Sequence, residues 1–175
     1  MSAALECDYN DNPTTLYLMI QDCDWARVGE RAKSHPKEAK TWIVRINPDT
    51  LELQWRILPL HAAILSQAPQ DVLETLLSVY AAAAKEQDDV GCLPIHWAIK
   101  KHCQPETINV LLAAYPKCIE IRNSAGVTPV EQSQQSSSPH KEYYLRALAP
   151  GPTYNAVTQS LSDLFCGINT CLTVE

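Results

Sequence analysis

The feature that most constrains this chain is a short motif that occurs twice at a fixed spacing. The two copies are Leu58-Pro59-Leu60-His61-Ala62-Ala63-Ile64 and Leu93-Pro94-Ile95-His96-Trp97-Ala98-Ile99, and they lie 35 residues apart. At the same shift, Leu76, Leu77 and Tyr80 recur as Leu111, Leu112 and Tyr115. An offset that holds across a whole unit predicts structural repeats, in which each unit buries its apolar face against its neighbours.

Each unit contains two segments in which the apolar residues have the spacing of an α-helix. Leu60, Ala63 and Ile64 share one face of a short first helix, which begins at a proline whose missing N–H costs nothing there. After a break that contains proline, residues 73–80 and 108–115 show the i, i+3, i+4, i+7 spacing of a second helix. The unit is therefore predicted to be a pair of helices, and a weaker third copy begins at Asn123, followed by Gly126 and Pro129.

The segment Asp88-Asp89-Val90-Gly91-Cys92-Leu93-Pro94-Ile95-His96-Trp97-Ala98 resembles the ankyrin-repeat signature Asp-x-x-Gly-x-Thr-Pro-Leu-His-x-Ala. The resemblance extends over residues 12–135 and implies an all-α fold, an ankyrin-like helical solenoid of three to four helix-pair repeats with β-hairpin fingers. Leu58 and Leu93 stand where the family has threonine. His61 and His96 must therefore find another hydrogen-bond partner, and part of the family's usual tie between repeats is expected to be missing.

Three regions are expected along the chain. Residues 1–11 are predicted to be a flexible N-terminus, residues 12–135 the repeat domain, and residues 136–175 a degenerate C-terminal cap helix and tail. Within the domain, residues 41–57 alternate in polarity around an Asn-Pro-Asp turn, which predicts an enlarged first hairpin finger. Its two tryptophans, Trp42 and Trp55, either pack across the hairpin and on the cap or leave one ring open for a ligand protein.

The C-terminal part offers fewer signals. Residues 132–138 are rich in serine and glutamine and are expected to be mobile, with Ser138 before Pro139 as a candidate site for a proline-directed kinase or an ordinary exposed loop. Residues 141–148 are predicted to form the cap helix, with Tyr144, Leu145 and Leu148 as its apolar face. The amphipathic stretch 155–165 either folds back on the last repeat or binds a partner.

Charge and cysteine content limit the possible partners and cofactors. The formal net charge of −6 argues against nucleic acid or an anionic membrane as the main partner, and no apolar run is long enough to span a bilayer. Without a secretion signal, the seven cysteines are expected to be reduced and the protein to be cytoplasmic or nuclear, although Cys166 and Cys171 could pair. We expect no cofactor and no metal, because Cys92, His96, His102 and Cys103 lack the spacing of paired zinc ligands.

No catalytic motif is visible, so we expect that the protein is not an enzyme, with a thiol-dependent hydrolase as the least favoured alternative. The resemblance implies a non-catalytic protein–protein interaction module, an adaptor or scaffold that binds a partner on its concave face, or alternatively a structural subunit of a larger assembly. That face would consist of Gln54, Trp55, Ile57, Leu65, Ser66, Asp89, Val90, Cys92, Lys100, Lys101, Ser124, Ala125 and Val127. It is apolar around Trp55 and mixed in charge around Lys100, which predicts a partner with an apolar knob beside acidic residues.

Overall fold

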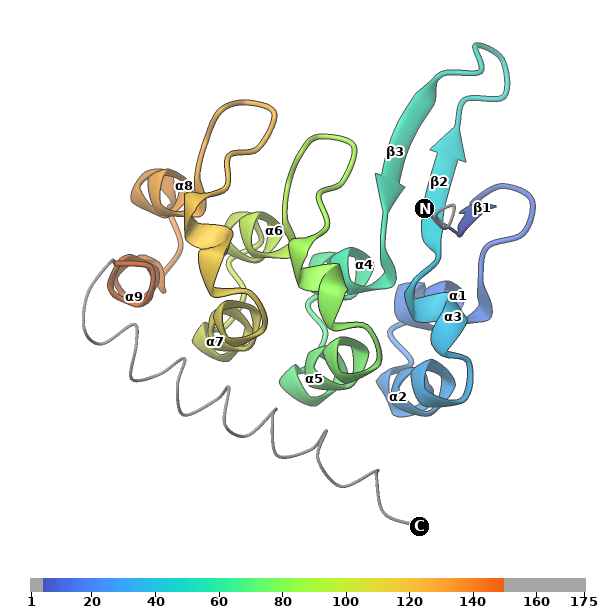
Figure 1. The fold of residues 1–175 in the computed structure, drawn as a ribbon, viewed down its shortest axis with the longest axis horizontal. Helices are drawn as coiled ribbons and strands as arrows, with labels where there is room; N and C mark the ends of the chain where they lie inside the picture. Colours follow the sequence, from blue (N-terminus) through green and yellow to red (C-terminus); the bar gives the residue numbers. More distant parts are fainter. Residues whose placement is uncertain (1–4, 150–175) are drawn as a thin grey trace.

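A computed structural model describes residues 5–149 of the chain, in which pairs of antiparallel helices stand in a row (Figure 1). The first pair is α1 (Thr15–Gln21) and α2 (Trp25–Ser34), followed by the single-turn helix α3 (Pro36–Ala39). The next pairs are α4 (Pro59–Leu65) with α5 (Gln70–Val79), α6 (Pro94–Lys100) with α7 (Pro105–Ala114), and α8 (Pro129–Gln135) with α9 (Lys141–Ala147). Short 3₁₀ helices, η1 (Ala81–Lys85) and η2 (Pro116–Glu120), follow α5 and α7.

The predicted all-α fold class is wrong, because the described residues form a mixed α/β fold of nine α-helices and a three-stranded sheet. Strands β2 (Trp42–Ile46) and β3 (Leu53–Ile57) form the predicted hairpin, which is antiparallel and has an irregularity between Arg45 and Ile46. The unforeseen strand is β1 (Glu6–Asp8), which pairs in parallel with β2. Part of the N-terminus expected to be flexible is therefore held in a sheet, by pairing with residues far away in the sequence.

In the two full copies of the motif, the histidine side chain caps the start of its own helix. Nδ1 of His61 accepts the N–H of Leu58 at 3.4 Å, and Nδ1 of His96 accepts the N–H of Leu93 at 3.1 Å. Because Nδ1 is the acceptor, Nε2 carries the proton, and His96 donates it to the carbonyl of Val127 in the next repeat, 3.2 Å away. The Nε2 of His61 is buried without a hydrogen-bond partner, so the tie between repeats is present at one copy and missing at the other.

The third copy uses a different cap. It has a threonine at the position of the two leucines and a glutamate at the position of the histidines. Oγ1 of Thr128 accepts the N–H of Glu131 at 3.2 Å, and Oε2 of Glu131 accepts the N–H of Thr128 at 2.9 Å. This reciprocal pair satisfies two donors at the start of α8, so a helix begins here although the motif has decayed.

The core runs between the helix pairs along the row. Helix α4 packs against α1 and α6, and α5 packs against α2 and α7, so this pair is covered on both sides by its neighbours. Leu77 and Leu112, which share one repeat position, are 3% and 4% exposed. Of the predicted apolar face, Tyr144 in α9 and Leu148 at its C-cap are fully buried and Leu145 is half-buried. The Tyr144 hydroxyl donates to the carbonyl of Cys103.

The segment expected to be mobile is ordered in the structure, so that prediction is wrong. Helix α8 extends to Gln135, and Ser133 within it is fully buried. Ser138 is also buried, and its hydroxyl bonds to that of Tyr144 at 3.4 Å, which leaves it a poor substrate for a kinase. Composition did not foresee that two serines of the segment are buried where α8 packs against α9, while Gln134, Gln135 and Ser137 stay exposed.

Candidate partner-binding surface

Three fingers rise on the same side of the helix row (Figure 1). The first finger is the hairpin of β2 and β3, the second comprises residues 86–92, and the third comprises residues 121–127. Oδ1 of Asp89 accepts the main-chain N–H of Arg56 at 2.8 Å, which joins the second finger to the first. The main-chain N–H of Ser124 donates to the carbonyl of Val90 at 3.1 Å, which joins the third finger to the second. The fingers therefore form one continuous surface.

The second finger is organised by the carboxylate of Asp88, which is only 7% exposed. Its Oδ1 accepts the N–H groups of Val90 at 3.1 Å and Cys92 at 2.7 Å, and its Oδ2 accepts the indole N–H of Trp97 at 2.6 Å. Burial raises the pKa of Asp88, although these donors oppose the shift. Gly91 closes the turn with a φ of 70°, a backbone conformation that favours glycine.

The third finger repeats this design with an amide. Oδ1 of Asn123 accepts the N–H groups of Ala125 and Val127, each at 3.0 Å. Gly126 closes this turn with a φ of 76°. Because both fingers are fixed by their own side chains, they hold their shape without a ligand.

Trp97 lies at the base of this surface and was missed in the sequence analysis. The ring is half-buried, its N–H is held by Asp88, and the Nζ atom of Lys100 lies 4.6 Å from the ring centroid. Its position in the motif is occupied by Ala62 in the preceding copy and Gln132 in the following one. A bulky residue at a repeat position that otherwise varies was the signal that could have found it.

The two tryptophans of the first finger have different environments. Trp42 is 5% exposed, and the guanidinium of Arg56 covers its ring at 3.8 Å from the centroid. Trp55 is half-buried in an aromatic cluster, with its ring centroid 5.2 Å from that of Tyr9 and 6.4 Å from that of Tyr17. These contacts favour the interpretation in which both rings pack on the hairpin and the first repeat.

The structure separates the predicted contact residues by exposure. Those with exposed side chains are Gln54, Asp89, Val90, Lys100, Lys101, Ser124 and Ala125. Those that are half-buried are Trp55, Ile57, Leu65, Ser66 and Val127. Cys92 is buried at 8% exposure, so its side chain offers little surface to a partner. Its thiol points into the finger row, where the amide of Asn123 donates to it at 3.7 Å.

A pocket of about 220 Å³ lies between α6 and α8, where both helices end. It is lined by Ile99, Lys100, His102, Gln132, Gln135, Ser136 and Ser137. The side-chain amide of Gln132 donates to the carbonyl of His96 at 3.0 Å, while its Oε1 is buried without a partner. The pocket therefore combines positive charge at its edge with an unused acceptor in its wall.

Four cysteines of the described range do not resemble activated nucleophiles. Burial raises the pKa of Cys7 and Cys92, and it raises the pKa of Cys103 to about 11 and that of Cys118 to about 12. A raised pKa disfavours the thiolate, which is the reactive form. Within residues 5–149, no cluster of three or more His, Cys, Asp or Glu side chains could hold a metal ion. None of the helices in that range is long and apolar enough to cross a membrane.

Comparison with protein-family models and with curated proteins finds no match for this chain. Its function is therefore inferred from the repeated motif and from the surface that the repeats expose.

Proposed function

We propose that this protein is a non-catalytic interaction module, an adaptor or scaffold of the ankyrin-repeat kind that binds a partner protein on its finger surface. We define the finger surface as the three fingers together with Trp97, Lys100 and Lys101 of the α6 region. The observation that carries the proposal is the hydrogen-bonded row of fingers, which exposes side chains that do not belong to the core. Val90 is 46% exposed at the second fingertip, beside the exposed carboxylate of Asp89.

The chemistry of the finger surface favours a protein over a nucleic acid. An exposed valine and a half-buried tryptophan supply apolar contact, and aspartate and lysine side chains border them. Protein interfaces combine such an apolar centre with a polar rim. A nucleic acid would instead require clustered cations without a carboxylate at the fingertip, and the chain as a whole has a formal charge of −6.

The rigidity of the fingers also supports this proposal. Binding orders flexible loops at a free-energy cost of about 0.5–1.5 kcal/mol for each immobilised long side chain, and a preorganised loop avoids part of that cost. Here the bonds to Asp88 and Asn123 fix two fingers in advance. We further propose a cytoplasmic or nuclear location, which the five free thiols among the described residues support.

The experiment is site-specific photocrosslinking from the finger surface. A photoreactive residue placed at Val90 should capture a defined protein, while one placed at Ser78, exposed on α5, should not capture it. The captured protein is then produced separately and titrated against the parent chain and the Val90→Arg variant. A loss of affinity of about tenfold or more, with unchanged thermal unfolding, is expected for an interface residue.

Two results would contradict the proposal. Capture of the same protein from Ser78 and not from Val90 would place the interface on the other side of the helix row. Equal binding by the parent and Val90→Arg would show that the fingertip takes no part. A partner that copurifies in fixed stoichiometry through purification would identify the chain as a structural subunit of an assembly.

A further inference from the structure

The pocket between α6 and α8 arises from the substitutions in the third repeat. Gln132 occupies the position of Trp97 in the motif, and Ser136 and Ser137 occupy the positions of Lys101 and His102, each 35 residues later. Shorter side chains therefore stand where the preceding repeat has long ones. The volume that they leave is the pocket of about 220 Å³ at the ends of the two helices.

The side chains that line the pocket are suited to an anion. Lys100 and His102 contribute cationic or hydrogen-bond-donating groups, and Gln135, Ser136 and Ser137 add amide and hydroxyl donors. None of the lining residues is acidic. Lys101, the residue after Lys100, is exposed, and neither lysine forms an ion pair with another residue of the described range.

One electrostatic effect opposes an anion at this position. The C-terminal end of a helix carries a partial negative charge equivalent to about half an elementary charge, and two helices end here. Lys100, which lines the pocket, brings a full positive charge to the same place, and Lys101 is the next residue in the chain. Because α6 and α8 have only seven residues each, their dipoles are also small, so the lysines dominate.

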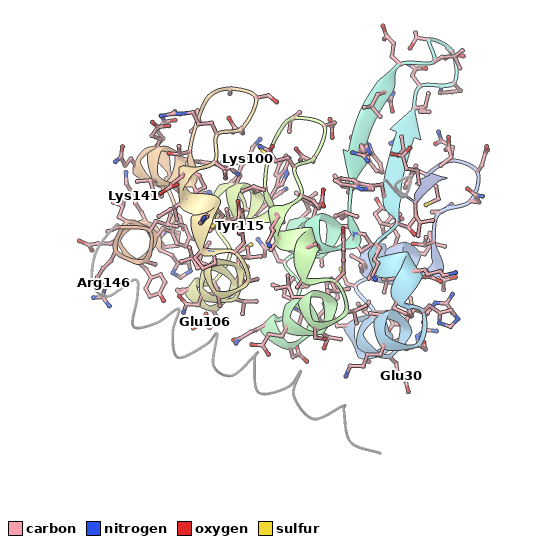
Figure 2. The ribbon with its side chains drawn as sticks, viewed as in Figure 1. Glu30, Lys100, Glu106, Tyr115, Lys141 and Arg146 are labelled. Carbon is pink, nitrogen blue, oxygen red and sulfur yellow. The ribbon has the colours of Figure 1, made fainter. Side chains whose placement is uncertain are left out.

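The pocket also adjoins an aromatic surface. Figure 2 shows Lys100 at α6, between the second and third fingers, and its Nζ atom lies 4.6 Å from the ring centroid of Trp97. Such a contact at an exposed site contributes only about 0.5–1 kcal/mol, so Lys100 is free to turn toward a ligand carboxylate.

We propose that the pocket binds the side-chain carboxylate of a glutamate or aspartate in the partner protein, next to an apolar residue of the partner that contacts Trp97. Lys100 and His102 bind the carboxylate, and the hydroxyl and amide groups of Ser136, Ser137 and Gln135 line the same pocket. This inference rests on the proposed function, because the pocket belongs to the finger surface. It specifies a short motif in the partner, an acidic residue beside an apolar one.

The test uses random peptides displayed on phage and selected on the full-length chain. The selected peptides should share a glutamate or aspartate beside an apolar residue. In fluorescence-polarisation titrations, changing that glutamate to glutamine should weaken binding by about tenfold, and Lys100→Glu should do the same to the parent peptide. A peptide with lysine at the acidic position should regain affinity for Lys100→Glu, which a merely unfolded variant would not show.

Two further variants control for other effects. Lys117→Glu makes the same charge change at an exposed lysine on η2, outside the pocket, and should leave peptide affinity unchanged. His102 has a φ of 56°, so His102→Asn keeps a residue that tolerates this conformation while it removes the imidazole. His102→Asn should weaken binding of the peptide that contains glutamate and leave the affinity for the peptide with glutamine at that position unchanged.

The outcomes distinguish this inference from the proposed function. If peptide affinity falls with Val90→Arg but is unchanged by Lys100→Glu and by the glutamate-to-glutamine change in the peptide, the pocket inference is refuted and the finger-surface proposal is retained. If none of these three changes alters peptide affinity, both the pocket inference and the finger-surface proposal are refuted. Selection of no peptide, or only of peptides without an acidic residue, would also refute the pocket.

Discussion

Removal of the Asp88 carboxylate should destabilise the protein because three donors depend on it. The N–H groups of Val90 and Cys92 and the indole N–H of Trp97 all donate to this side chain, at distances of 2.6 to 3.1 Å. In Asp88→Ala, the donors of Cys92 and Trp97 lose their partner in a buried or half-buried setting, while Val90 lies in an exposed stretch where water can replace the bond.

The expected free-energy change follows from these three cases. A buried donor left without a partner costs about 1–3 kcal/mol, and a donor that water can reach costs much less. Two donors of the first kind predict a loss of about 3 kcal/mol in the free energy of unfolding for Asp88→Ala. The third finger suggests the milder variant, because Asn123 holds its two main-chain donors with an amide oxygen.

Asp88→Asn should therefore keep the main-chain bonds and lose only the bond from Trp97. We expect it to cost about 1 kcal/mol, which is the net contribution of a single hydrogen bond. Burial disfavours the charged form of Asp88 and so raises its pKa, and because Asp88→Asn removes this buried charge, part of the cost is offset. Trp97→Phe removes the other partner of the same bond and keeps most of the ring.

The assay is urea unfolding followed by far-ultraviolet circular dichroism, together with amide hydrogen exchange at Cys92. In a double-mutant cycle, Asp88→Asn and Trp97→Phe should be non-additive by about 1 kcal/mol, because each removes the same bond. An unchanged slope of free energy against urea would show that the native and unfolded states are comparable among variants. If Asp88→Ala lies within about half a kcal/mol of the parent, Asp88 does not organise the finger.

Three other predictions concern the turns, the core and the pH dependence. Gly126→Ala should lower the free energy of unfolding by about 1 kcal/mol through backbone strain alone. Gly91→Ala should lower it further, because the added Cβ would lie 2.6 Å from the Ser124 hydroxyl oxygen. Equal melting temperatures of the two variants would contradict this prediction. Leu112→Ala should cost about 2–5 kcal/mol in urea unfolding, since its side chain is 4% exposed, and a loss below about half a kcal/mol would show that its core position is misassigned. Burial lowers the pKa of His61 to about 4 from 6.5, so the unfolded state binds a proton that the native state does not, and stability falls as the pH drops below 6.5. Between about pH 7 and pH 5 this histidine should account for a loss of about 2 kcal/mol, which His61→Asn should abolish in unfolding titrations at the two pH values.

The sequence by itself was sufficient to predict the helix pairs and the first hairpin. The prolines at Pro59, Pro94 and Pro129 mark the first residues of α4, α6 and α8 in the structure. The apolar stripe that contains Leu77 and Leu112 marks the buried face of α5 and α7. These features depend on residues within a few positions of one another, so local spacing and turn chemistry contain enough information.

Tertiary structure alone decided the features that depend on distant residues. Strand β1 exists because Glu6–Asp8 pairs with β2, which lies more than thirty positions away in the sequence. Three residues of mostly polar character are too short a pattern to predict that strand. Ser133 is buried in α8, which packs against α9, and Ser138 is buried where it bonds to Tyr144 of α9, although their composition suggested mobility. The same reason applies to the binding surface. A hydrogen bond across a turn joins Asp88 to Trp97. The pocket beside Lys100 depends on the volume that the shorter side chains of the third repeat do not fill. The repeat period specifies where side chains recur in the sequence but not the space between them.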